Sequence, residues 1–124
     1  MIRNFLMIGL GGALGSMLRY AGVLLIGPRA FPLAIFLINV IGSFIIGLVM
    51  ALSIKNETFS GNWKLFLATG ICGGFTTFST FSLDNLLLFE ARKYGMLALN
   101  LTGSVLLGAI AVWVGFKCIN LVTE

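Results

Sequence analysis

The sequence predicts an all-α integral membrane protein with four transmembrane helices, the third of which is broken. The 124 residues are 59% hydrophobic and 10% charged, whereas ordinary soluble domains carry about 25% charged residues. The mean hydropathy is +1.08, the apolar residues gather in four segments, and the third segment has a polar interior. Because a soluble fold of this length cannot bury so much apolar surface, residues 1–124 are expected to form a single membrane domain.

Each apolar segment is long enough to cross the membrane as a helix. A hydrocarbon core of about 30 Å takes roughly 20 helical residues. Unpaired backbone groups are costly in lipid, and the period-two polarity of a membrane barrel is absent, so helices are expected rather than strands. The first segment resembles a signal peptide but has no A-x-A cleavage site, so we expect it to be retained. The predicted helices run from about Phe5 to Ile26, Leu33 to Ile54, Trp63 to Ala91 and Met96 to Val122.

Lysine and arginine are distributed almost evenly over the two ends of such a bundle. One end holds Arg3, Lys55, Lys64 and Lys117, and the other holds Arg29, Arg92, Lys93 and, if its side chain reaches the interface, Arg19. Orientation normally follows the imbalance of these charges, so near balance predicts dual topology, with copies inserted both ways up. Two opposite copies would form an antiparallel homodimer similar to the inverted repeats of transporters. The alternative is one fixed orientation set by other factors.

The small residues and the cysteines indicate how the helices pack and which sites are not expected, but they do not indicate a function. Pairs spaced i, i+4 allow close helix packing; they are Gly11 and Gly15, Ser43 and Gly47, and Ser104 and Gly108. The chain has no histidine, and its two cysteines, Cys72 and Cys118, lie apart in apolar segments. Metal–thiolate sites and disulfide frameworks are therefore not expected. No nucleotide-binding motif is present, and neither an organic cofactor nor nucleic acid is expected.

The stretch "GGFTTFSTFS", residues 73–82, lies near the midpoint of the third segment. Irregular backbone persists at that depth only when it is buried in protein or lines a water-filled cavity. The stretch holds Gly73, Gly74 and several hydroxyl side chains, and its middle is near Thr77. A break there would leave carbonyl groups at the end of one half-helix and N–H groups at the start of the next. Carbonyls attract cations and N-terminal amides attract anions. The sequence therefore predicts an ion site at the membrane midplane.

Three phenylalanines, Phe75, Phe78 and Phe81, recur every three residues and would share one helical face. The edge of an aromatic ring carries partial positive charge, so these rings and the neighbouring hydroxyl groups together suit a small anion. The alternative is a stripe of rings that packs against another helix. The spacing alone favours packing.

Few other polar side chains lie within the apolar segments. Asn39 lies in the second segment, and Asn100 and Ser104 share a face of the fourth. Arg19 is the only cation well inside an apolar run. An ionisable group at that position is a functional candidate, and the alternative is a side chain that extends to the interface.

Three motifs resemble the small dual-topology fluoride channels called Fluc, or CrcB. They are "GGALGSMLRY" (11–20), "NVIGSFIIG" (39–47) and "TGICGGFTTFSTFS" (69–82), and the resemblance covers nearly the whole chain. It implies a passive channel rather than an enzyme, in the cell membrane, formed by an antiparallel homodimer with two pores. Such a channel lets the membrane potential expel fluoride and so relieves its toxicity.

The resemblance also implies roles for individual residues. It matches Asn39, Phe78 and Phe81 to pore residues, carries over the hydroxyl groups of Ser79 and Thr80, and places Ser104 on a polar track. It implies a central sodium ion held by the backbone carbonyls of Gly73 and Thr76, and Arg19 is our vestibule candidate. This chain has Gly108 where some members keep a hydroxyl group. The resemblance assigns no role to Phe75, Asp84, Glu90 or Asn100.

Two rival functions are weaker. A small multidrug antiporter also has four helices and dual topology, but it needs a membrane carboxylate, typically in the first helix. The first helix here offers only Arg19, so an anion pathway is favoured. A membrane assembly subunit without transport activity would explain the glycine pairs but not the midplane break.

Overall fold

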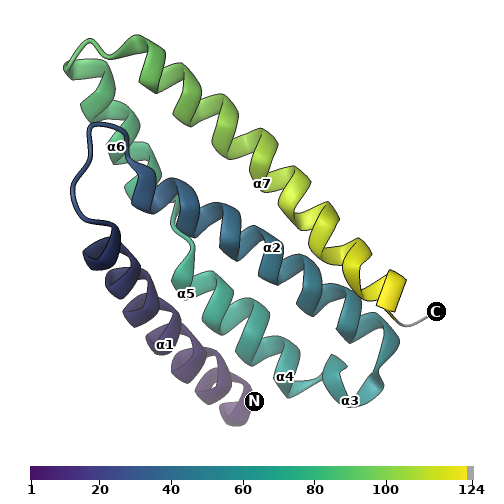
Figure 1. Ribbon diagram of the computed structural model, residues 1–124. Helices are drawn as coiled ribbons and strands as arrows, with labels where there is room; N and C mark the ends of the chain where they lie inside the picture. Colours follow the sequence, from purple (N-terminus) through teal and green to yellow (C-terminus); the bar gives the residue numbers. More distant parts are fainter. Residues whose placement is uncertain (123–124) are drawn as a thin grey trace.

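The computed structural model describes residues 1–122, and these residues contain four helical segments of membrane-spanning length (Figure 1). Their mean hydropathies lie between 1.2 and 2.6. The predicted ends are confirmed to within three residues, the largest difference being at the start of the first helix, predicted at Phe5 and observed at Ile2. The chain is therefore a multi-pass membrane protein. Three segments are unbroken helices: α1 (Ile2–Ile26), α2 (Leu33–Lys55) and α7 (Tyr94–Val122).

The third segment is built from shorter pieces and is broken near its middle. A π-helical stretch, η1, leads into α5, and two extended residues, Thr76 and Thr77, separate α5 from α6. The predicted break is confirmed and falls at Thr76 and Thr77, whereas Gly73 and Gly74 are helical. The pieces are α3 (Glu57–Ser60), α4 (Asn62–Lys64), η1 (Leu65–Cys72), α5 (Gly73–Phe75) and α6 (Phe78–Glu90).

Gly74 is required for the packing of α5 against α1 and does not form the break. A Cβ atom on Gly74 would overlap the carbonyl oxygen of Gly12 in α1 and lie 3.0 Å from its Cα. Gly15 of α1 faces the same segment, and a Cβ there would overlap the Ile71 carbonyl oxygen and lie 2.8 Å from the Phe75 nitrogen. The backbones of α1 and the η1–α5 segment are therefore in direct contact, as small-residue spacing predicts.

The helices form a row in which α2 is central. In Figure 1, α1 lies along η1 and α5, these lie beside α2, and α2 runs along α7. Gly47 of α2 and Gly115 of α7 allow this second contact, because a Cβ on either would overlap a carbonyl oxygen of the other helix. The second half of the broken helix, α6, packs on α7.

The two ends of the molecule carry the loops that the sequence assigned to them. The N-terminus, α3 and the end of α7 lie at one end, and the α1–α2 loop and the α6–α7 turn lie at the other (Figure 1). The α6–α7 turn closes through Arg92, whose φ of 55° is in the left-handed region. The buried core is small and lies mostly on α2, and long apolar side chains of α1 and α7 remain exposed. One copy therefore leaves most of its apolar surface for lipid or for a partner.

Candidate ion site at the helix break

The break in the third segment has a defined hydrogen-bonding pattern. The last helical bond before it runs from the Thr76 N–H to the Cys72 carbonyl at 3.0 Å, and the Thr76 hydroxyl donates to the same carbonyl at 2.9 Å. Thr76 and Thr77 are extended, with ψ angles of 158° and 124°. Threonine is a common residue before a helix because its side chain can accept from the first turn. Here Thr77 Oγ1 accepts from the Thr80 N–H at 3.2 Å.

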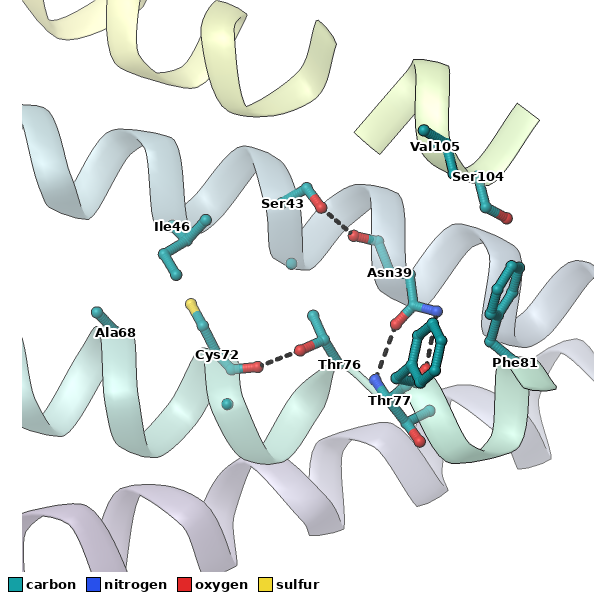
Figure 2. A pocket seen from close by; sticks show the side chains of 13 residues that line it. Asn39, Ser43, Ile46, Ala68, Cys72, Thr76, Thr77, Phe81, Ser104 and Val105 are labelled. Carbon is teal, nitrogen blue, oxygen red and sulfur yellow. Dashed lines mark hydrogen bonds between the residues drawn. The ribbon is translucent and has the colours of Figure 1, made fainter. Parts of the chain in front are cut away.

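Asn39 of α2 pairs with both backbone groups of Thr77 (Figure 2). Its Nδ2 donates to the Thr77 carbonyl at 3.1 Å, and its Oδ1 accepts from the Thr77 N–H at 2.9 Å. Thr77 is 8% exposed, and a buried backbone group without a partner would be unfavourable. One amide side chain therefore satisfies the backbone that the broken helix leaves unpaired.

Two carbonyl groups before the break are released from the helix. The N–H that would pair with the Gly73 carbonyl in a continuous α-helix belongs to Thr77, and it is directed to Asn39 instead. The Thr76 carbonyl accepts from Arg19 Nη1 at 3.2 Å. Arg19 therefore reaches from α1 to the break rather than to the membrane interface. Since a carbonyl oxygen has two lone pairs, the bond to Arg19 leaves one acceptor position on Thr76.

Hydroxyl groups gather at the N-terminus of α6, on the other side of the break. Thr77 Oγ1 lies 3.2 Å from Ser79 Oγ and donates to Thr80 Oγ1 at 3.2 Å. The first N–H groups of a helix have no intrahelical acceptor and carry partial positive charge. Donors for an anion therefore lie on the α6 side of the break, and acceptors for a cation lie on the α5 side.

A cavity of about 400 Å³ lies against the break. Asn39 and Ser43 enter it from α2, and Ser104 enters from α7 (Figure 2). Phe78 and Phe81 of α6 complete the wall, with ring centroids 5.7 Å apart. The described residues that line this cavity are all uncharged. The site therefore offers amide, hydroxyl and ring-edge contacts without a fixed charge.

The comparisons with known proteins identify the family. A family model described as "CrcB-like protein, Camphor Resistance (CrcB)" matches residues 6–116. The chain belongs to the CrcB family. Similar proteins include the "Fluoride-specific ion channel FluC" of Azobacteroides pseudotrichonymphae, 41% identical over 119 residues that cover 94% of this chain and 95% of that protein. The protein of the same name from Oceanobacillus iheyensis is 43% identical over 117 residues, covering 94% and 91%. That of Thermus thermophilus is 41% identical over 119 residues, covering 94% of each chain.

Most of the residues selected from the CrcB motifs meet at the first cavity. Its lining includes Asn39, Gly73, Thr76, Phe78, Phe81 and Ser104. Ser79 is exposed and joins the site through its contact with Thr77. Arg19 touches the break from the α1 side and is not part of the cavity wall. Gly108 lies beside Ser43 of α2, with 3.6 Å between a Cβ placed there and Ser43 Oγ.

The expectation that three phenylalanines share one helical face is wrong for this CrcB protein. The break falls between Phe75 and Phe78, so the period of a continuous helix does not apply across it. Phe78 and Phe81 follow the break on α6 and line the cavity. Phe75 ends α5 and lies against α2, where its Cδ1 is 3.3 Å from a Cβ placed on Gly42.

A second cavity of about 460 Å³ lies toward the α1–α2 loop and the end of α6. Thr80 and Asp84 line it together with two cations, Arg29 and Lys93. Asp84 Oδ2 is buried and has no hydrogen-bond partner in the described part of the chain. Because Thr77 lines the first cavity and Thr80 the second, their hydroxyl–hydroxyl contact lies between the two.

Sequence reasoning missed two features of the CrcB site. The pairing of Thr77 with Asn39 was not expected, although a threonine three residues before another hydroxyl at a helix start is a capping signal. The bond between Asn85 of α6 and Asn100 of α7 was also missed. Asn85 was not singled out at all, and an amide within a membrane-spanning segment was the available signal.

Proposed function

We propose that this protein is a passive, fluoride-selective channel that lets fluoride leave the cytoplasm. The observation that carries the proposal is the uncharged cavity at the start of α6, whose mostly apolar wall includes the polar side chains of Asn39 and Ser104. Further support comes from the family relatives, which are named as fluoride-specific ion channels. A negative interior potential drives an anion outward with about 2.3 kcal/mol per charge per 100 mV. No coupled energy source is needed for export down that gradient.

Donors around the cavity can replace part of the hydration of a small anion. An asparagine amide has two N–H groups, so the bond from Asn39 to Thr77 leaves one N–H available. The Phe78 and Ser79 amides belong to the first turn of α6, where no intrahelical acceptor exists. The Ser104 hydroxyl and the Phe81 ring edge face the same space. Closely spaced donors in a narrow path favour fluoride over a larger halide.

The pathway is completed by a second copy in the opposite orientation. Two residues that line the cavity, Phe78 and Val105, are nevertheless 79% and 67% exposed. A polar cavity that opens on the membrane face of one chain would meet hydrocarbon, which is unfavourable for its donors. An antiparallel copy would cover this face and bring the two breaks together at a two-fold axis.

A sodium ion at that axis fits the carbonyl groups of the break. Hard cations prefer oxygen ligands. The Gly73 carbonyl has lost its helical donor, Gly73 itself is exposed, and the Thr76 carbonyl keeps one acceptor position beside Arg19. Gly73 and Thr76 of both copies would hold the ion through backbone oxygens. The bound cation would join the two broken helices.

Proton-coupled drug export, the main rival, needs a carboxylate in the transport cavity. The first cavity has none among its described lining residues, and α1 contains no acidic residue. Asp84 opens instead on the second cavity, together with Arg29 and Lys93. The uncharged wall beside the break therefore favours an anion pathway.

The test is fluoride release from liposomes that contain the purified protein. A potassium gradient with valinomycin sets the potential, a fluoride electrode follows release, and chloride-loaded vesicles serve as the ion control. We expect rapid fluoride release and no chloride release. Vesicles prepared with N-methylglucamine instead of sodium should release fluoride more slowly, because the dimer loses its central cation. Equal rates would overturn the sodium assignment alone, and no fluoride release from folded dimer would overturn the channel.

Matched phenylalanine variants test whether the cavity is the pathway. Phe81→Ile removes the ring edge from the cavity and should slow release about tenfold, the effect of losing an interaction of about 1.4 kcal/mol. Phe89→Ile is the control, because Phe89 lies later on α6 and makes an edge-to-face contact with Tyr94 outside both cavities. Equal slowing by both variants would mean that the first cavity does not conduct.

A further inference from the structure

A buried pair of amide side chains joins α6 to α7. Asn85 Oδ1 accepts from Asn100 Nδ2 at 2.9 Å, and the two residues are 9% and 1% exposed. In lipid, a hydrogen bond between amide side chains helps to hold two helices together. The pair therefore has a packing role, and its position on α7 gives it a connection to the cavity as well.

The amide pair continues to the cavity wall. Ser104 lies one turn after Asn100 on α7, and its hydroxyl donates to Asn100 Oδ1 at 3.4 Å. Ser104 lines the first cavity with Asn39 and Phe81. A continuous line of polar groups thus runs from Asn85, inside the α6–α7 contact, to a hydroxyl at the candidate pathway.

The donor–acceptor direction of the hydrogen bonds along this line determines whether Ser104 offers an ion its proton or its lone pairs. In the arrangement described, the Ser104 proton is directed to Asn100, so its lone pairs are left for the cavity. If both amides turn over, Asn85 donates to Asn100, Asn100 donates to Ser104, and the Ser104 proton is free for an anion. Turning one amide alone would set two donors or two acceptors against each other. The two amides must therefore turn together.

We propose that Asn85 is a positioning residue that acts through Asn100 to set whether Ser104 presents its proton or its lone pairs to the cavity. The inference rests on the proposed fluoride function, since an anion requires the donor form. A bond of 3.4 Å is longer than the usual range for a hydroxyl donor and is correspondingly weak. The bond from Ser104 to Asn100 is therefore readily replaced when the two amides turn and Asn100 becomes the donor.

A double-mutant cycle in the liposome assay tests the relay. Asn85→Val and Asn85→Thr introduce side chains of the same shape, and only threonine has a hydroxyl group that can pair with Asn100. Because losing one hydrogen bond in the relay affects the rate by about tenfold, we expect release through Asn85→Val to be about tenfold slower than through Asn85→Thr. When Ser104→Ala is added, the two variants should become equal. Size-exclusion chromatography establishes that equal amounts of folded protein are compared.

Each outcome separates the relay from other roles of Asn85. Equal rates for Asn85→Val and Asn85→Thr would overturn the proposal, and so would an unchanged difference between them after Ser104→Ala. If the wild-type protein releases no fluoride, the channel assignment fails and the relay fails with it, whereas release without coupling removes the relay alone. If Asn85→Val does not fold, Asn85→Ala and Asn85→Ser repeat the comparison, because they also differ by one hydroxyl group.

Discussion

A single side chain, Asn39, holds the broken helix together at its weakest point. A chain break at the membrane midplane leaves backbone donors and acceptors where no lipid group can satisfy them. The two hydrogen bonds between Asn39 and Thr77 resemble the pairing between neighbouring strands, and they join residues 38 positions apart in the sequence. The residue implied by the family resemblance to lie in the pore is therefore also the one that makes the break possible.

Replacing Asn39 should reduce the stability of the protein as well as its fluoride release. Asn39→Leu leaves both backbone groups of Thr77 unpaired, and we expect a loss of about 1–3 kcal/mol of unfolding free energy. Asn39→Gln keeps both the donor and the acceptor of the amide, so its loss should be smaller. Thermal unfolding in detergent measures both changes.

Thr102→Val is the control for these variants. The Thr102 hydroxyl is exposed and donates only within its own helix, to the Ala98 carbonyl at 2.6 Å. Its removal should change the unfolding free energy by about 0.5 kcal/mol or less. If Asn39→Leu unfolds at the wild-type temperature, Thr77 does not depend on Asn39.

The presence of a polar side chain at Asn39, within an apolar segment, could be read from the sequence, but its partner could not. The sequence shows an amide within an apolar run, which is unusual in a membrane helix. Its partner is the backbone of Thr77, which any residue type could supply, so no side-chain pattern indicates it. The same reasoning applies to Arg19, whose acceptor is the Thr76 carbonyl. Side-chain-to-backbone bonds across the fold become visible only when the helices are placed.

At the scale of the helical elements, α1 and the η1–α5 segment are in direct backbone contact. Gly11 and Gly15 lie against backbone atoms of residues 66–75. Van der Waals contact between backbones is a main source of helix association in lipid, where the hydrophobic effect between helices is absent. This contact also fixes the first half of the broken helix in front of Arg19.

Adding one methyl group to this contact should separate the elements. In Gly15→Ala the new Cβ would overlap the Ile71 carbonyl oxygen, and backbone atoms cannot move aside as a flexible side chain can. We expect a loss of about 1–3 kcal/mol, the usual effect of overpacking, with a lower unfolding temperature and slower fluoride release. Gly12→Ala is the matched control, because a Cβ on Gly12 meets nothing within 4 Å. Equal unfolding temperatures for the two variants would show that α1 packs differently.

The four membrane segments and a break near the middle of the third could be predicted from the sequence, whereas the residues that leave the helix could not. Residues 73–82 include a glycine pair and several hydroxyl side chains, and composition alone does not say which of them become extended. In the fold, Gly74 is needed where α5 meets Gly12, and the chain becomes extended only where Asn39 can pair with it, at Thr77. The break is thus determined by a partner on α2 rather than by the local preference of residues 73 and 74.

The molecule as a whole presents nearly balanced charge at its two ends. Arg19 is turned inward to Thr76 and does not contribute to either interface. Of the remaining cations, Arg3, Lys55, Lys64 and Lys117 lie at one end and Arg29, Arg92 and Lys93 at the other. A difference of four against three gives little preference for either orientation. Under the proposed function a second copy covers the open cavity on the membrane face, and dual insertion would supply that copy in the antiparallel orientation.

Thiol labelling from one side of the membrane tests this dual insertion. Ala30 lies exposed in the α1–α2 loop, and Gly61 lies exposed at the opposite end. Each position is changed in turn to cysteine in a chain whose Cys72 and Cys118 are replaced by alanine. Because insertion without a charge preference gives equal populations, an impermeant reagent should label about half of the copies at each position.

The same design shows whether insertion follows charge and whether function requires both orientations. Ala91→Lys adds a cation to the end that carries Arg29, and Lys64→Gln and Lys117→Gln remove two from the other end. The balance changes from four against three to two against four, so labelling at position 30 should shift strongly toward one side. Fluoride release should fall together with the number of antiparallel pairs, and co-expression of a chain with the opposite charge bias should restore it. Complete labelling at one position and none at the other in the unmodified chain would instead mean a single fixed orientation, and the cavity would then need a different partner.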